Sequence, residues 1–204
     1  MTDEMQSIRD DLAFLKSLAA DDGPFPRTVG LQFLAPGVLY GLAAVLAWAI
    51  VKGLVPLPES FAGQLGLWPT VVYLPILLVL IVTGRRPPAG TASRAMVVAW
   101  SGVGLTTLSM LAVIFIAGAR LNVPGIWQVW TSICFSLWGA AWWAFAVLRR
   151  NRAWFIVAAG SLMTAVVNAV LIGTPEELLG CGLGILFWLG GPGLVITLRG
   201  ASRG

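Results

Sequence analysis

The chain has 204 residues, of which 58% are hydrophobic and only 11% are charged, whereas soluble domains carry roughly 25% charged residues. So few charges leave too little polar surface to cover a water-soluble globule, which excludes that class and favours a protein folded in lipid. The net charge is +4, and histidine is absent, which removes the commonest metal ligand and the usual general base. We therefore predict no enzymatic activity, no cofactor, no metal and no nucleic-acid partner.

The first element in the chain is a short amphipathic helix within residues 1–27. Its apolar face repeats with alternating three- and four-residue spacing. The face comprises Met5, Ile8, Leu12 and Leu15. Six acidic residues against two basic ones in the first 22 make the helix a poor match for an anionic lipid surface. We predict that this face binds a protein partner or packs on the remainder of the same chain.

Six apolar stretches of membrane-spanning length follow. They cover about 31–53, 65–83, 95–118, 126–148, 153–173 and 177–198. Strands of a membrane barrel would alternate apolar and polar residues, but these stretches are apolar at nearly all positions. The predicted fold is all-α: a polytopic membrane bundle of six transmembrane helices over residues 28–204, preceded by the cytoplasmic amphipathic helix.

Arginine and lysine predict the orientation of the bundle. The loops after the second and fourth stretches, together with the two chain ends, hold eleven of the thirteen basic residues. Only Lys52 and Arg120 fall on the other side. Because basic residues concentrate in cytoplasmic loops, we expect both termini in the cytoplasm and the chain in a bacterial inner membrane.

The second and third stretches, and the fourth and fifth, look like two related hairpins. Both hairpins begin with Gly, an aliphatic residue and Trp, both reach Arg-Arg, and each continues with a helix that opens with Arg-Ala. They lie about 58 residues apart. A duplication is one interpretation, although apolar helices also resemble each other by composition alone.

Acidic residues are missing from the central part of every stretch, so the usual marks of proton relays and ion-coupled transport are not found. The polar residues that remain inside are neutral. They are Ser101, Thr106, Gln128, Ser132, Ser136, Ser161, Thr164 and Asn168. These side chains could line a path for a small neutral solute, or they could bond one helix to another. We prefer the second interpretation, because polar residues are common at contacts between membrane helices.

Small residues suggest where helices approach closely. Gly37 and Gly41 on the first stretch, and Gly180 and Gly184 on the sixth, both have the spacing of glycines at tight helix contacts. We expect such contacts within one chain or between two copies.

The sixth stretch contains the run Gly190-Gly191-Pro192-Gly193. Proline has no N–H to offer the carbonyl of Trp188, and glycine lowers the cost of unusual dihedral angles, so the helix should kink or unwind. Broken helices form binding sites in some transporters, but proline and glycine are also frequent in ordinary membrane helices. A packing kink and a binding or gating element are both left open.

Residues 129–143, VWTSICFSLWGAAWW, resemble the second-helix segment of the tryptophan-rich sensory protein (translocator) family. The resemblance implies a helical bundle that binds porphyrins or sterols in an aromatic-lined pocket. That pocket would involve Trp130, Thr131, Trp138, Gly139 and Trp142. The family has five crossings with this segment second, whereas here it falls fourth of six. The overall layout is similar to small bacterial membrane proteins with six crossings.

Three functions follow from these observations. The first is a non-enzymatic accessory, sensory or scaffold protein that acts through helix contacts, as a homo-oligomer or as a subunit of a membrane complex. The second is a channel or facilitator for a small neutral solute. The third is the binding of an apolar ligand or pigment in an aromatic-lined pocket.

Overall fold

A computed structural model describes residues 6, 25, 27–83, 91–123 and 125–201. This part of the chain is helical and contains no strand. Its helices are α2 (Arg27–Val51), α3 (Glu59–Gln64), α4 (Trp68–Thr83), α5 (Thr91–Leu121), the 3₁₀ turn η1 (Ile126–Gln128), α6 (Val129–Arg149), α7 (Arg152–Leu171), α8 (Glu176–Ile185), the π-helical turn η2 (Leu186–Gly190) and α9 (Gly191–Ala201). Met5, Ile8, Leu12 and Leu15 lie outside the described residues, so the amphipathic helix stays a prediction.

Six helical segments are long and apolar enough to cross a membrane. They are Arg27–Val51, Glu59–Thr83, Ala95–Leu121, Ile126–Arg149, Arg152–Leu171 and Glu176–Gly200. Each coincides with a predicted stretch, which confirms the all-helical class and the number of such segments. The second segment begins earlier than predicted, as α3, and turns at residues 65–67 before α4. Gly66 weakens the helix at this turn, and Pro69 suits the first turn of α4.

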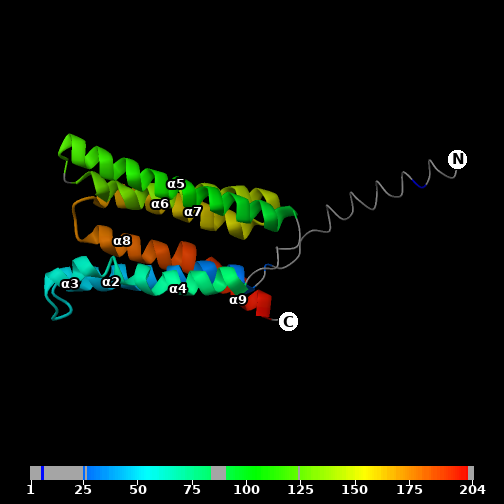
Figure 1. Cartoon of the computed structure of the whole chain (residues 1–204), viewed down its shortest axis with the longest axis horizontal. Helices are drawn as coiled ribbons and strands as arrows, with labels where there is room; N and C mark the ends of the chain where they lie inside the picture. Colours follow the sequence, from blue (N-terminus) through cyan, green and yellow to red (C-terminus); the bar gives the residue numbers. More distant parts are fainter. Residues whose placement is uncertain (1–5, 7–24, 26, 84–90, 124, 202–204) are drawn as a thin grey trace.

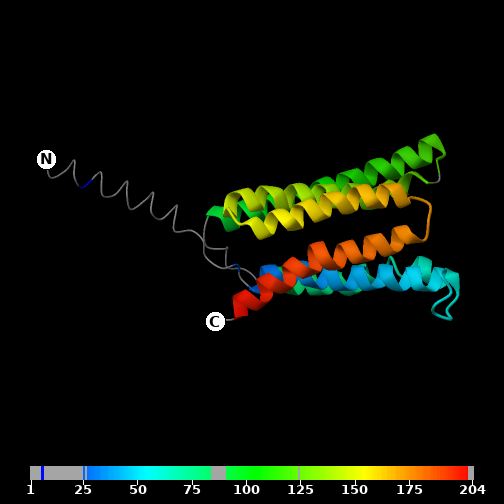
Figure 2. The same cartoon turned by 180° about the vertical axis from the view of Figure 1, so that it is seen from behind.

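The helices form two layers (Figures 1 and 2). One layer holds α2, α3, α4, α8, η2 and α9, and the other holds α5, α6 and α7. The α6–α7 connection and the C-terminal end of α9 lie at one end of the molecule, which we call the basic end. Its basic residues include Arg27, Arg149, Arg150, Arg152 and Arg199. The opposite end carries α3, Lys52 and the start of α8, and we call it the Lys52 end.

The hairpin predicted from the second and third stretches is wrong. In the described part of the chain α4 packs on α2, α5 packs on α6, and α4 and α5 belong to different layers. Hydrogen bonds hold α4 on α2: the Tyr40 and Thr70 hydroxyls are 2.7 Å apart, and the Tyr73 hydroxyl donates to the carbonyl of Gln32 at 3.2 Å. By contrast, α6 and α7 form an extensively packed hairpin. The two sequence hairpins therefore do not share one packing arrangement.

Aromatic side chains fill the space between the layers toward the basic end. Trp142 of α6 is fully buried at the centre of this group, which we call the aromatic cluster. Its ring stacks on Trp154 of α7 at 5.2 Å between centroids and meets Trp100 of α5 at 5.0 Å. Phe33 of α2 reaches across from the other layer to within 5.4 Å of Trp142. Edge and stacked ring pairs of this kind stabilise a contact beyond the apolar area they bury, so the cluster joins the layers firmly.

The outer faces of both layers are apolar, and the charged residues gather at the ends. Phe115 and Val170 are each more than three-quarters exposed, with many other large apolar side chains beside them. Lys52 and Glu176 form an ion pair of 2.5 Å at the Lys52 end. An apolar belt between charged ends is unfavourable in water and is the pattern of a membrane-spanning bundle.

Candidate ligand-binding cavity

A cavity of about 750 Å³ lies between the two layers, from the Lys52 end to the middle of the bundle. We call it the interlayer cavity. Its lining residues come from both layers: Pro36, Tyr40, Ala43, Ala44, Ala47, Ala62, Gly63, Leu65, Gly66, Thr107, Trp127, Trp130, Thr131, Cys134, Phe135, Trp138, Leu178, Cys181, Ile185 and Leu189. None of these residues is charged. The cavity lies within the range of about 300–1,000 Å³ that is usual for small-molecule sites.

Small side chains on α2 create this space. Ala43, Ala44 and Ala47 recur at helical spacing on the face of α2 that meets the cavity. Across the gap, Trp130 and Trp138 of α6 supply large flat walls. Because alanine cannot reach across to the indole rings, the layers remain apart here, although they meet at the aromatic cluster.

The cavity ends at the aromatic cluster. Pro36 and Trp138 line its deep part, and one helical turn further along the same helices Phe33 and Trp142 pack on each other. The π-helical turn closes the same region with Leu189, which is buried. The interlayer space is therefore hollow toward the Lys52 end and filled toward the basic end.

Two of the three hydroxyl groups in the wall are already bonded. The Tyr40 hydroxyl is paired with Thr70, as described above. The Thr131 hydroxyl lies 3.4 Å from a Glu177 carboxylate oxygen and 3.3 Å from the Gln128 carbonyl, and it can donate to either. Thr107 is the exception, because its buried hydroxyl has no hydrogen-bond partner within the described residues. The wall is thus largely apolar and suits an uncharged ligand.

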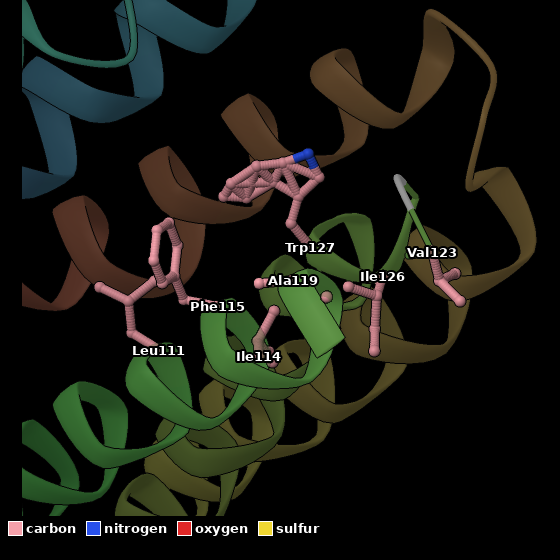
Figure 3. Close-up of a pocket in the computed structure, with 8 residues that line it drawn as sticks. Leu111, Ile114, Phe115, Ala119, Val123, Ile126 and Trp127 are labelled. Atoms are coloured by element: carbon pink, nitrogen blue, oxygen red, sulfur yellow. The ribbon is translucent and has the colours of Figure 1, made fainter. Parts of the chain in front are cut away.

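A second, smaller pocket of about 260 Å³ lies beside the first and is lined by α5, Val123 and η1 (Figure 3). We call it the lateral pocket. It is lined by Leu111, Ile114, Phe115, Gly118, Ala119, Val123, Ile126 and Trp127. Trp127 also lines the interlayer cavity, so one indole ring borders both spaces. In Figure 3 this ring projects from η1 into the space between α5 and α8.

None of the eight neutral polar residues predicted to lie inside lines the interlayer cavity. Ser101 and Ser136 are exposed on outer faces, where their hydroxyls donate to the Val97 and Ser132 carbonyls of their own helices, at 2.8 and 2.9 Å. Ser132 itself is buried and its hydroxyl has no partner in the described part of the chain. Two more of the eight predicted polar residues, Thr106 on α5 and Gln128 on η1, are half-buried.

The three polar residues of α7 lie against the other helices. Thr164 donates to the Gly160 carbonyl and accepts a hydrogen bond from the Trp188 indole, both at 2.8 Å. Ser161 and Asn168 are fully buried, and their polar atoms have no partner among the residues described. Asn168 sits directly against Gly180 of α8, where a Cβ would come within 2.5 Å of its Oδ1. The structure therefore brings this face into helix contacts rather than into a path.

The Gly190–Gly193 run does not break the sixth segment. Instead the backbone widens into the π-helical turn, and the N–H of Gly191 donates to the carbonyl of Leu186, five residues earlier. Pro192 comes directly after this turn, and α9 continues from it. A π turn of this kind accommodates a proline by local widening, so helix continuity is kept. Trp188 packs over Gly160 of α7 and does not line the interlayer cavity.

Glycines on α2 and on the sixth segment allow the two backbones to touch. A Cβ at Gly37 would collide with the backbone of Gly190, and one at Gly193 would come within 2.8 Å of Leu34 Cα. A Cβ at Gly41 would clash with Leu186. The predicted tight contact at Gly37 and Gly41 is thus made within the chain.

The glycines at 180 and 184 face other helices. Gly180 lies against Asn168 of α7, and Gly184 lies against Thr164 of α7 and Phe135 of α6. The sixth segment therefore uses two sets of glycines, one toward α2 and one toward α6 and α7.

The stretch that resembles the translocator family divides between three surroundings. Trp130, Thr131 and Trp138 line the interlayer cavity. Gly139 packs on Leu162 of α7, and Trp142 belongs to the aromatic cluster. Sequence reasoning missed the opposite wall, where the alanines of α2 and the thiol of Cys181 on α8 lie, although the spacing of those alanines was visible. It also missed Cys134, which lies between Trp130 and Trp138 on α6. Comparison of the chain with protein-family models, with curated proteins and with solved structures gives no match.

Proposed function

We propose that this protein crosses a lipid bilayer with its six helices and binds a neutral, apolar ligand in the interlayer cavity. The observation that carries the proposal is an uncharged, aromatic-walled space inside a bundle whose other interlayer space is densely filled. Ligand sites are typically concave and mostly apolar, with few polar groups. A water-filled path for a polar solute would instead need polar side chains along its wall, and the neutral residues predicted for that role lie elsewhere.

We further propose that the basic end faces the cytoplasm of a bacterial inner membrane. Support comes from the gathering of arginines at one end of the bundle and from the apolar outer faces between the ends. The accessory or scaffold function and the homo-oligomer stay predictions, because they depend on the amphipathic face of residues 1–27.

Filling the cavity tests the binding proposal. Ala44→Phe places a ring in the space beside α2, whereas Leu42→Phe puts the same ring on the exposed face of the same helix and serves as the matched control. Each protein is purified from its native membrane in mild detergent and extracted with organic solvent, and the extract is analysed by mass spectrometry.

We expect an apolar compound near one equivalent per chain in the wild type and in Leu42→Phe, and a loss of most of it in Ala44→Phe. Equal extracts from all three proteins, with the same thermal unfolding midpoint, would mean that the cavity holds no ligand.

A further inference from the structure

The two layers are packed together on one side of the interlayer cavity but not on the other. On one side α7 packs on α8 and on η2. On the opposite side, within the described residues, α4 and α5 do not pack extensively on each other, and the lateral pocket is lined by residues of α5 and η1. The α5 side is therefore where the packing of the two layers leaves room for a path from the surrounding lipid into the cavity.

The lateral pocket is open to the outside of the bundle. Phe115, which lines it, is 77% exposed, and Leu111 and Val123 are also exposed. All eight of its lining residues are apolar. In a bilayer this pocket would be filled by lipid chains or by a molecule dissolved among them.

Trp127 stands between this pocket and the interlayer cavity. It belongs to the wall of both, and its side chain is 53% exposed, so it is not held by dense packing. Half-exposed side chains change rotamer on a picosecond to nanosecond timescale, and a rotation of this ring would join the two spaces. Among the residues that the structure describes, no other lines both pockets.

We propose that the ligand reaches the interlayer cavity from the lipid, through the lateral pocket, with the Trp127 ring as the movable partition. This inference rests on the proposed function and specifies the ligand further, as a molecule dissolved in the bilayer. An apolar molecule partitions strongly into lipid, so a side opening receives it at a far higher local concentration than an opening to water.

Two native thiols make the route measurable without knowledge of the ligand. Cys134 and Cys181 are free and both line the interlayer cavity. N-phenylmaleimide, an apolar alkylating reagent, can report access from lipid when it is added to the protein in liposomes. Intact-mass spectrometry gives the rate of modification, and Cys134→Ala and Cys181→Ala assign it to each thiol.

Three variants change the route in different directions. Trp127→Ala removes the partition and should raise the rate about three- to tenfold, which corresponds to roughly 0.7–1.4 kcal/mol in barrier height. Ala119→Phe fills the lateral pocket without touching the cavity and should lower the rate by a similar factor. Trp68→Ala removes an equally exposed tryptophan that lines neither space and should leave the rate unchanged.

The maleimide rates test the lateral route, and the ligand extracts test the binding proposal, so the two can fail independently. Wild-type rates in both Trp127→Ala and Ala119→Phe would overturn the lateral route, whatever the cavity binds. The binding proposal stands or falls on the extracts of Ala44→Phe, which do not depend on the route. A fast reaction in Trp127→Ala with a slow one in Ala119→Phe would support the route, and thermal unfolding midpoints close to the wild type would show that both variants are folded.

Discussion

At the scale of single residues, the hydrogen bond between Trp188 and Thr164 shows how polar side chains serve the bundle. The indole of Trp188 lies over Gly160, where no side chain intervenes, and its N–H reaches the Thr164 hydroxyl. That hydroxyl also donates to the Gly160 carbonyl, so both of its hydrogen-bonding roles are used. The pair joins the sixth segment to α7 at the level of the π turn.

A double-mutant cycle on this pair should give a favourable coupling. Trp188→Phe removes the donor and keeps most of the ring, and Thr164→Val removes the acceptor while keeping the shape. Because hydrogen bonds between membrane helices are worth about 0.6 kcal/mol on average and about 1.7 at most, we expect a coupling in that range. Unfolding of the four proteins in detergent with increasing denaturant measures it, and strictly additive losses would contradict a direct bond.

The residue scale also explains why the sequence could not decide whether these polar side chains line a path or bond to helices. Serine and threonine in a helix can donate to the carbonyl four residues earlier, as Ser101, Ser109 and Ser136 do. A hydroxyl that bonds to its own helix needs no polar surroundings, so it can face lipid as well as an interior. The sequence shows that such a residue is present but does not show which way it is turned.

At the scale of elements, the sixth segment and α2 form a contact in which backbone meets backbone. The glycines at 37 and 193 leave no room for a Cβ, and the π turn brings Gly190 against α2. In lipid the hydrophobic effect does not drive helices together, so their association depends on close packing. Small residues permit that packing because they let two helix backbones approach each other. The glycine-proline run therefore serves this contact, and its proline is accommodated by the turn before it.

Two glycines of the run give a matched test of this contact. Gly193→Ala would bring a Cβ against the backbone of Leu34, whereas a Cβ at Gly191 would meet only the Leu186 carbonyl oxygen at 3.9 Å, an ordinary contact. We expect Gly193→Ala to destabilise the protein by about 1–3 kcal/mol, the usual cost of overpacking. Gly191→Ala should be neutral or stabilising by up to about 1 kcal/mol, because alanine favours helix.

Thermal unfolding in detergent compares the two variants with the wild type. Helix propensity changes equally in both, so the difference between them reports the contact alone. Equal stabilities would mean that α9 does not approach α2 this closely.

At the scale of the whole molecule, the sequence predicts the six helices but not their partners. Spanning length and apolar composition are local properties of about 20 residues, so each segment could be marked without knowledge of the others. The division into layers depends on which helix faces carry glycine, alanine or tryptophan. Because each segment is apolar on nearly all of its faces, hydropathy does not show which face meets another helix. The predicted pairing of the second and third segments was wrong because hydropathy does not show which helix a segment packs on. In the structure α4 packs on α2 and is hydrogen-bonded to it.

The cavity was still harder to foresee, because its walls come from segments far apart in the chain. Alanines near residue 44 face tryptophans near residue 134, and nothing in either stretch indicates the other. Only the tryptophan-rich wall, through Trp130 and Trp138, was singled out in the sequence, and there by resemblance.

The orientation of the whole molecule is the last property that can be tested directly. In a background with Cys134→Ala and Cys181→Ala, Leu54→Cys places a thiol in the exposed turn at the Lys52 end, and Ala153→Cys places one at the exposed start of α7, at the basic end. Neither change alters a charge, so the basic residues that set topology are kept. A membrane-impermeant maleimide added to intact spheroplasts should label Leu54→Cys and leave Ala153→Cys unlabelled until the membrane is permeabilised. The reverse pattern would place the arginines outside, and the distribution of charge along the bundle would then need another cause than the positive-inside rule.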